Sequence, residues 1–207
     1  MVFSDRILDW YQRHKRELPW RKTRDPYLVW LSEILLQQTR VAQGLPYYER
    51  FAARFPTVSD LAAATEGEVL KLWQGLGYYS RARNLHATAR RVVAEYGGHF
   101  PPAYDELLKL KGIGPYTAAA IASICFGQPH PVVDGNVYRV LSRYFGVELP
   151  VNSTEGSRYF ARLAEEVLDR DQPGEFNQAL MEFGALQCTP QSPDCPAGRL
   201  SESCEAL

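Results

Sequence analysis

Glu33 is a carboxylate in the middle of a stretch that should otherwise be buried. Residues 27–40 read Y-L-V-W-L-S-E-I-L-L-Q-Q-T-R, and apolar side chains occupy most sides of the helix that this spacing predicts. Burial disfavours the ionised form of a carboxyl group and raises its pKa, and a general acid needs such a pKa to keep its proton at neutral pH. Glu33 is therefore a candidate general acid. A structural carboxylate paired with a nearby arginine is the alternative.

Asp134 is a second carboxylate, at a position where a helix should begin. It precedes G-N-V-Y-R-V-L-S-R, residues 135–143, in which apolar side chains recur at helical spacing. Aspartate is common at such a position because its side chain accepts hydrogen bonds from the first backbone N–H groups of the helix. Taken alone, Asp134 is expected to be an N-cap, and a chemical role would need further residues around it.

A glycine-rich hairpin between these two carboxylates could bind an anion. Residues 110–117 read L-K-G-I-G-P-Y-T, in which Gly112 and Gly114 bracket Ile113 and allow backbone conformations that other residues avoid. The pattern predicts a helix, a tight hairpin and a second helix. The first backbone N–H groups of that second helix, together with its dipole, would suit a DNA phosphate whatever the base sequence. A plain hairpin of two helices with glycine caps is the alternative.

Helices are the elements expected to hold these residues in place. Apolar residues recur at helical spacing along nearly all of the 207 residues, and the breaks fall at glycine or proline. We expect about ten short helices with little or no strand, and therefore an all-α fold. The sequence has no run of roughly 18 apolar residues and no signal peptide, so we expect no membrane span and a cytoplasmic location.

Positive charge is concentrated locally rather than over the whole chain. The net charge of −1 gives no general attraction for nucleic acid. Residues 71–93, however, contain basic residues and no acidic residue, which makes this segment a candidate phosphate-facing surface. A merely solvated helix explains the pattern equally well. The basic residues of the segment are Lys71, Arg81, Arg83, Arg90 and Arg91.

The order of five motifs resembles that of the MutY-type adenine glycosylases, a branch of the helix-hairpin-helix DNA glycosylases. The motifs are W-L-S-E-I-L-L-Q-Q-T from residue 30, G-L-G-Y-Y-S-R-A-R-N-L from residue 75, the G-I-G-P-Y-T hairpin, V-D-G-N-V from residue 133 and F-N-Q-A-L-M-E-F-G-A-L-Q-C from residue 176. The resemblance covers nearly the whole chain. It implies two helical lobes, residues 22–130 and residues 1–21 with 131–207, with a DNA cleft between them and a C-terminal cysteine-cluster loop.

The resemblance also implies roles for four residues in cleaving an N-glycosidic bond. Cleavage makes a poor anionic leaving group and a cationic sugar, so one protonated acid and one ionised acid address the two charges. Glu33 would protonate N7 of adenine, and Asp134 would stabilise the oxocarbenium sugar or attack it. Tyr116 and Asn136 would hydrogen-bond these carboxylates and the sugar. Endonuclease III-like lyases have a catalytic lysine at the position of Tyr116, so we expect a monofunctional enzyme, with Lys111 close enough only for weak lyase action.

The same resemblance implies how the chain would reach a base inside duplex DNA. The base must flip out of the duplex, and the hole that it leaves must be filled. Gln38 and Tyr78 would probe and wedge the duplex beside the opposing base. Phosphates would be bound through Arg81, Lys111, Gly112 and Gly114, and the adenine pocket would contain Trp20, Arg21, Leu36 and Gln178. Plain core packing is the alternative for Tyr78 and Trp20.

Three of the four cysteines lie together near the end of the sequence. Cys188, Cys195 and Cys204 form a cluster that, in a cytoplasmic protein, suggests metal rather than disulfides. The MutY-type family carries a 4Fe-4S cluster on C-x6-C-x2-C-x5-C, and the third position here is Gly198. We expect a labile or incomplete iron-sulfur cluster with a structural role, and a three-thiolate zinc site is the alternative. Cys125 is expected to be a small core residue.

The expected function is the monofunctional removal of adenine mispaired with 8-oxoguanine or guanine. The chain would act as a monomer on double-stranded DNA with a mismatched or damaged base pair, at the nucleoid if the cell is bacterial. It ends at Leu207, whereas the MutY-type family continues into a domain that helps recognise 8-oxoguanine. One alternative is a glycosylase for thymine or uracil opposite guanine, which would share the hairpin tyrosine but not Q-Q-T. Another is a non-catalytic DNA-binding or iron-sulfur module, which would need neither Glu33 nor Asp134.

Overall fold

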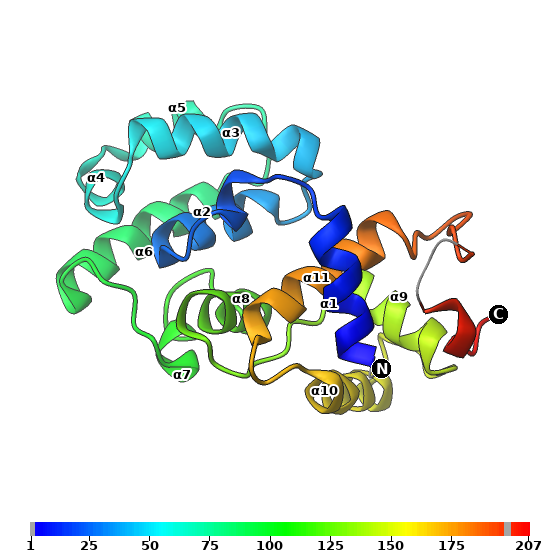
Figure 1. The fold of residues 1–207 in the computed structure, drawn as a ribbon. Helices are drawn as coiled ribbons and strands as arrows, with labels where there is room; N and C mark the ends of the chain where they lie inside the picture. The colour runs from blue at the N-terminus through cyan, green and yellow to red at the C-terminus, as the bar shows by residue number, and fades with distance from the viewer. Residues whose placement is uncertain (1–2, 197–199) are drawn as a thin grey trace. The chain divides into compact units, whose positions relative to one another are not determined.

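The computed structural model describes residues 3–196 and 200–207, and its regular elements are helices (Figure 1). Within these two ranges no residue belongs to a β-strand, which confirms the all-α prediction. The described chain forms eleven α-helices, α1 to α11, and two short 3-10 helices, η1 and η2. None of these helices is both long and apolar enough to cross a membrane.

The chain divides into two compact units, which we call the central and the terminal unit. The central unit is Leu18–Ile121, and the terminal unit combines Met1–Glu17 with Ala122–Leu207. We expected the boundaries before residue 22 and after residue 130. The second boundary lies nine residues earlier, inside the helix α8, Pro115–Phe126. Periodicity cannot reveal such a boundary because the apolar spacing of one helix continues across it.

The central unit is a stack of short helices around α6. α6 packs against α4 and α5, and α2 packs against α3 (Figure 1). The fully buried side chains that hold them together include Trp30, Phe51, Leu61, Trp73 and Leu85. The elements of this unit are η1 (Pro19–Arg21), α2 (Pro26–Leu36), α3 (Val41–Arg54), α4 (Val58–Ala63), α5 (Glu66–Trp73), α6 (Ser80–Tyr96), α7 (Tyr104–Leu107) and the first part of α8.

Local sequence signals set where the helices of the central unit begin and end. Thr57 and Thr65 cap α4 and α5, each in a capping box with the acidic residue three positions later, Asp60 or Glu68. Each box satisfies backbone N–H groups that the first turn of a helix leaves without partners. α6 ends at Gly97, whose φ of +62° lies in the left-handed region that glycine adopts without strain. These signals set where α4 and α5 begin and where α6 ends.

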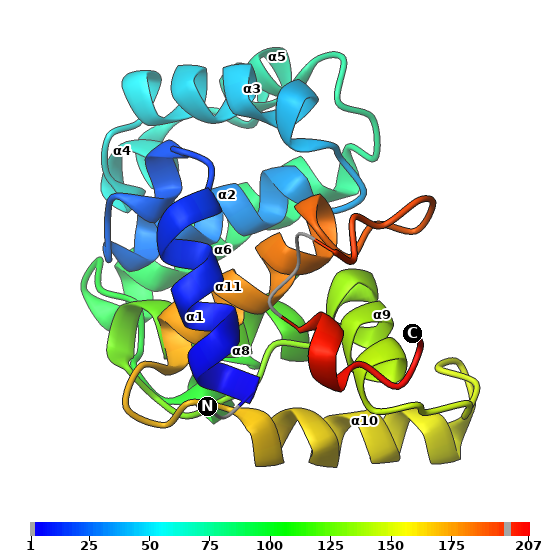
Figure 2. The same cartoon turned by 45° about the vertical axis from the view of Figure 1, so that its right-hand side comes forward.

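The terminal unit is centred on α11, which packs against α1 and α9 (Figure 2). α9 also packs against α10. Cys125, expected in the core, is only half-buried. The buried cluster of this unit includes Ile7, Trp10, Val137, Phe160 and Phe176. Its elements are α1 (Phe3–His14), the last part of α8, α9 (Gly135–Tyr144), α10 (Thr154–Val167), α11 (Pro173–Leu186) and η2 (Ser201–Ser203).

An ion pair ties the segment after α1 to α11. Glu182 is 1% exposed, and its Oε1 accepts hydrogen bonds from the backbone N–H and the Nε of Arg16, each at 2.9 Å. Its Oε2 accepts a third from Nη2 of Arg16 at 2.5 Å. The hydrogen bonds with Glu182 raise the pKa of Arg16. A carboxylate this buried is tolerated only because it is so fully paired.

Candidate active site

Glu33 lies on α2, a helix that is buried along most of its length. Asp25 caps α2 by accepting a hydrogen bond from the N–H of Tyr27 at 2.9 Å, and the helix then runs through the core of the central unit. Glu33 itself is half-buried, whereas the sequence suggested a buried carboxylate. Leu36 and Gln37, three and four residues further on the same side, are half-buried too. This side of α2 is therefore partly accessible to solvent.

Asp134 is the N-cap of α9, and both of its carboxylate oxygens accept hydrogen bonds. Oδ1 accepts from the backbone N–H of Val137 at 2.8 Å, which confirms the expected cap. Oδ2 accepts from the side-chain amide of Asn136 at 2.9 Å. The side chain is half-buried, and two donors fix the orientation of its carboxylate. The structure thus brings Asp134 and Asn136 together as the resemblance implied.

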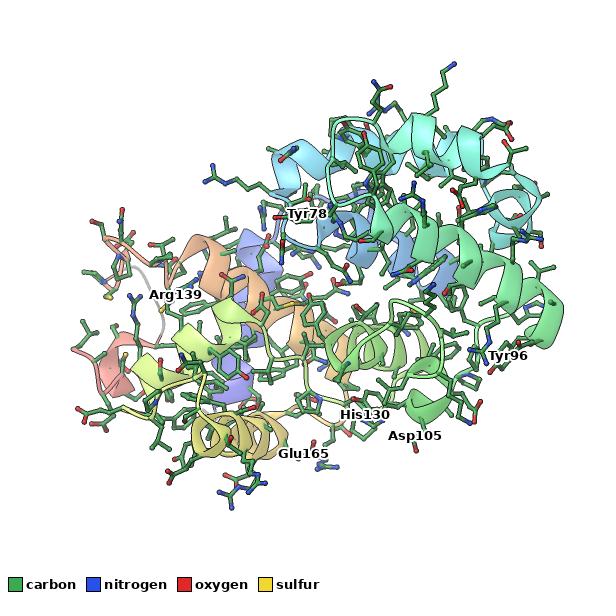
Figure 3. All side chains as sticks on the ribbon, turned by 180° about the vertical axis from the view of Figure 1, so that it is seen from behind. Tyr78, Tyr96, Asp105, His130, Arg139 and Glu165 are labelled. Carbon is green, nitrogen blue, oxygen red and sulfur yellow. The ribbon has the colours of Figure 1, made fainter. Side chains whose placement is uncertain are left out.

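Asn136 is itself oriented by Arg139 and α11. Nη2 of Arg139 donates to Oδ1 of Asn136 and to the carbonyl oxygen of Gly184, each at 2.7 Å. Because the amide oxygen of Asn136 accepts from Arg139, its NH2 group faces Asp134. A Cβ on Gly184 would lie 2.7 Å from the Cβ of Asn136, so only glycine fits beside it. Figure 3 labels Arg139, whose Nε also donates to the carbonyl oxygen of Cys188 at 2.8 Å.

The predicted hairpin lies between α7 and α8, with its apolar side chains inward and its glycines outward. Leu110 and Ile113 are buried, and the N–H of Ile113 donates to the carbonyl oxygen of Leu110 at 3.1 Å. Lys111, Gly112 and Gly114 are exposed. Gly112 has a φ of +81°, as expected, whereas the φ of Gly114 lies outside the left-handed region. One glycine, rather than two, is therefore required by the backbone conformation.

Side chains of α6 anchor the hairpin within the central unit. Oγ1 of Thr88 donates to the carbonyl oxygen of Lys111 at 2.7 Å. A Cβ on Gly112 would lie 3.1 Å from the Cβ of Asn84, so the turn rests closely on α6. Tyr116 is half-buried in the first turn of α8, directly after the hairpin. The fixed hairpin presents exposed backbone at the N-terminus of a 12-residue helix, the arrangement that suits an anion.

Gln38 and Tyr78 stand out because both are exposed and both have left-handed backbone. Gln38 has a φ of +54°, and Tyr78 has a φ of +46° with 68% of its surface exposed. This exposure contradicts core packing for Tyr78. A left-handed conformation costs a non-glycine residue about 1–2 kcal/mol, and such strain often accompanies function. Gly75 and Gly77, with φ values of +100° and +71°, form the turn that leads to Tyr78.

Arg81 does not present a free charge to solvent. Its guanidinium donates to carbonyl oxygens at the end of α2 and is half-buried, which does not support the predicted phosphate contact. Two further arginines of the basic segment are paired, Arg83 with Glu66 at 3.3 Å and Arg91 with Glu95 at 2.8 Å. Much of the charge in residues 71–93 therefore has acidic or carbonyl partners inside the chain.

The four residues expected around the base pocket belong to different units. Trp20 is 8% exposed and packs edge-on against Tyr48, with 5.1 Å between ring centroids, which favours the core-packing alternative. Arg21 and Leu36 are half-buried in the same central unit. Gln178 belongs to the terminal unit, where its Oε1 accepts a hydrogen bond from the hydroxyl of Tyr11 at 3.1 Å. Neither unit by itself contains all four.

Cys188, Cys195 and Cys204 line one cavity of about 40 Å³ in the terminal unit. Arg143 of α9 contributes to the same wall, and its Nη1 donates to Sγ of Cys188 at 3.4 Å. It also donates to the carbonyl oxygen of Thr189 at 2.7 Å. The thiol of Cys204 donates to the carbonyl oxygen of Arg143 at 3.5 Å. Protein contacts thus organise the loop that carries these thiols.

The three thiols do not fit a complete 4Fe-4S cluster. Such a cluster ordinarily takes four thiolates. In the described part of the chain, no three Cys, His, Asp or Glu side chains are grouped as metal ligands. Gly198, at the third position of the family's cysteine pattern, lies outside the described residues and has no thiol to offer. These three cysteines therefore line one cavity, and they agree with the expected cluster in that respect alone.

Residues 31–168 match the sequence profile of the HhH-GPD superfamily base excision DNA repair proteins. The chain belongs to this superfamily. Among curated proteins, it is 47% identical to the adenine DNA glycosylase of Homo sapiens, over 99% of this chain and 39% of that protein. It is 44% identical to the adenine DNA glycosylase of Arabidopsis thaliana, over 97% of this chain and 36% of that protein. The resemblance seen in the motifs is confirmed, and the chain spans less than half the length of these two relatives.

Solved structures of other proteins share the fold of this chain. A thermostable thymine-DNA glycosylase superposes with a TM-score of 0.89 at 33% identity, covering 99% of this chain and 94% of that chain. Endonuclease III in a non-covalent complex with DNA superposes with a TM-score of 0.80 at 24% identity, covering 98% and 92%. The second likeness shows the fold alone.

Sequence reasoning missed the residues that hold the superfamily motifs in place. Arg139 and Arg143 lie one turn apart on α9 and reach the cysteine loop. Asn177 and Glu182 are polar residues within the mostly buried α11, and each is 1% exposed. An amide or a carboxylate inside an apolar run was the signal that could have identified the last two. Nothing in the sequence pairs the two arginines with their partners.

Proposed function

We propose that the chain is a monofunctional DNA glycosylase that removes adenine mispaired with 8-oxoguanine or guanine. The observation that carries the proposal is the fixed carboxylate of Asp134, whose two oxygens accept from Val137 and Asn136. The identity with curated adenine DNA glycosylases, which extends over nearly the whole chain, supports adenine as the base.

The chemistry is divided between two acids. Glu33 donates a proton to N7 of adenine, so the base departs neutral rather than as an anion. Asp134 remains ionised and stabilises the positive charge that develops on the sugar while the bond between C1′ and the base breaks. Water then supplies the oxygen that bonds to C1′, and its surplus proton passes to a carboxylate. The product is free adenine and an abasic site.

The hairpin tyrosine restricts the reaction to hydrolysis. Tyr116 cannot form a Schiff base with the sugar, so the DNA strand stays intact at the abasic site. Tyr116 is half-buried at the start of α8, and Lys111 is exposed four residues after α7. We assign Tyr116 to hydrogen bonding at the reacting centre and Lys111 to a phosphate.

The partner is double-stranded DNA that contains the mismatch, bound by a monomer. The exposed hairpin at Lys111, Gly112 and Gly114 binds a phosphate without reading sequence. Gln38 and Tyr78, exposed on their strained turns, enter the duplex when the adenine flips out. Their exposure supports this role because a core residue would have to leave its packing first.

The cysteine loop has no step in this chemistry. Cys188, Cys195 and Cys204 hold at most an incomplete iron-sulfur cluster, which stabilises the loop that Arg143 already contacts. Asp134 and Glu33 carry the reaction whether or not metal is bound.

Thymine opposite guanine is the second candidate substrate. The thermostable thymine-DNA glycosylase is 33% identical to this chain, and the adenine enzymes of Homo sapiens and Arabidopsis thaliana are 47% and 44% identical. The Q-Q-T after α2, with Gln38 exposed, favours adenine.

Single-turnover excision on defined duplexes tests the proposal. The duplexes carry adenine opposite 8-oxoguanine, guanine or thymine, and thymine opposite guanine, and are treated with alkali after incubation. We expect strand breakage at adenine opposite 8-oxoguanine and guanine, and only after alkali. Breakage at thymine instead would support the second candidate, and no breakage on any duplex would leave a DNA-binding protein without catalysis.

A further inference from the structure

The end of α2 is capped by a side chain from another helix. The last carbonyl groups of a helix have no partner within it and usually bond to a glycine turn or to water. Here Nη1 of Arg81, from the first turn of α6, donates to the carbonyl oxygens of Ile34, Leu35 and Gln37 at 3.1, 3.3 and 2.6 Å. Gln38, the next residue, is the strained and exposed residue of this turn.

The same guanidinium also contacts the turn that carries Tyr78. Nη2 of Arg81 donates to the carbonyl oxygen of Leu76 at 3.4 Å, and the guanidinium lies 5.0 Å from the ring centroid of Trp73 and 5.8 Å from that of Tyr78. Nε1 of Trp73 donates to the carbonyl oxygen of Gly77 at 2.9 Å, which also fixes this turn. Figure 3 labels Tyr78, which lies just before α6.

Arg81 therefore joins two strained turns through one rigid group. Among the described residues, three non-glycine positions have left-handed backbone, and Gln38 and Tyr78 are two of them. Strained backbone persists only where surrounding contacts over-determine it, and the planar fork of a guanidinium can bond both turns at once. Burial also lowers the pKa of Arg81, which reflects how far its charge is withdrawn from solvent.

We propose that Arg81 is a positioning residue, which holds Gln38 and Tyr78 in a fixed relation so that both enter DNA together. The proposal rests on the proposed function, because it takes Gln38 and Tyr78 as the residues that probe the duplex. It replaces the phosphate contact expected from sequence with an internal role. In this role the guanidinium orients the residues that contact DNA, and it does not itself bind the DNA phosphates.

Arg81→Met and Arg81→Lys distinguish positioning from phosphate binding. A phosphate contact contributes about 0.9 to the slope of log K against log salt, so losing it would reduce that slope by about that amount in Arg81→Met and largely spare Arg81→Lys. A positioning role predicts an unchanged slope in both variants. It also predicts a single-turnover excision rate that falls by roughly 10- to 100-fold, with little rescue by lysine, because an ammonium cannot bond both turns. Arg162→Met, an exposed arginine of α10, removes the same charge and should change neither quantity.

A double-mutant cycle tests whether Arg81 acts through the two turns. In a Gln38→Ala and Tyr78→Ala background, adding Arg81→Met should slow excision by less than about threefold, because the residues that Arg81 positions are already gone. A full additional loss of roughly 10-fold or more would overturn the proposal. A reduced salt slope with rescue by lysine would overturn it too.

Hydrogen exchange of the free protein tests the positioning role of Arg81 without a measurement of catalysis. In Arg81→Met, amides of residues 36–39 and 75–81 should exchange faster, including that of Thr39, which donates to Leu36 at 3.1 Å. Amides of α10 should not change, which separates local loosening from general unfolding. Unchanged exchange in both turns would overturn the proposal. If the wild-type chain excises no base, the proposed function fails while this measurement still tests Arg81.

Discussion

Replacing Asn177 with alanine should destabilise the terminal unit and loosen the segment that leads to Asp134. The side chain of Asn177 is buried on α11 and bridges to two other segments. Its Oδ1 accepts from the N–H of Val132 at 3.0 Å. Its Nδ2 donates to Oγ of Ser123 at 2.9 Å and to the carbonyl oxygen of His130 at 2.8 Å. Alanine removes all three hydrogen bonds at once.

The size of the effect follows from these contacts. A hydrogen bond contributes about 1 kcal/mol net, and a buried donor left without a partner costs about 1–3 kcal/mol. Val132 is 1% exposed, so its N–H cannot form a hydrogen bond with water in place of the one lost when Asn177 is truncated. We expect the free energy of unfolding to fall by roughly 3 kcal/mol. For a chain of this length, this lowers Tm by on the order of 6–12 °C.

Urea and thermal unfolding measure this loss, with the exposed Asn152→Ala as the matched control. The control should change the free energy of unfolding by less than about 0.5 kcal/mol. Well below its Tm, Asn177→Ala should also excise adenine more slowly than the control, because the segment before Asp134 has lost its anchor. A free energy of unfolding equal to that of the control would refute the reasoning.

Other changes test the acids, the ion pair and the cysteine loop. Glu33→Gln should abolish excision while sparing DNA affinity in a binding assay, and an active variant would remove the acid role. Asp134→Asn should slow single-turnover excision severely; a wild-type rate would leave that residue a helix cap only. Glu182→Gln should lower the free energy of unfolding by about 1–2 kcal/mol. This loss is smaller than the loss expected for a fully buried ion pair, because Arg16 is partly exposed. An unchanged free energy of unfolding would contradict this prediction. Iron and sulfide analysis should find fewer than four irons per chain, so a stable four-iron cluster would contradict the mismatch at Gly198.

The features that the sequence predicted well depend on residues close together in the chain. The cap at Asp134 and the left-handed Gly112 both involve partners within four positions. Their geometry is set by the backbone of one turn, so residue type and spacing suffice to predict it. The order of such local motifs also led to the correct superfamily.

The features that the sequence predicted poorly depend on residues that lie far away in the chain. Glu33 is half-buried rather than buried because helical periodicity describes α2 and not the neighbours that cover it. The boundary expected after residue 130 differs from the unit boundary inside α8 for the same reason. Cys125 was expected in the core and is only half-buried. An apolar stretch on α8 indicates a core helix, but it does not show which of its residues the rest of the unit covers.

Charge was the least informative signal, and Arg81 shows why. Residues 71–93 contain basic residues and no acidic residue. In the structure, however, Arg83 and Arg91 have carboxylate partners. Arg81 donates to carbonyl oxygens of residues more than forty positions earlier in the chain. A formal charge attracts a phosphate only where its own chain has left it exposed. The hairpin needs no such charge, since backbone N–H groups and a helix dipole act whatever the side chains. In this chain the proposed phosphate site therefore depends on glycine and helix geometry rather than on arginine content.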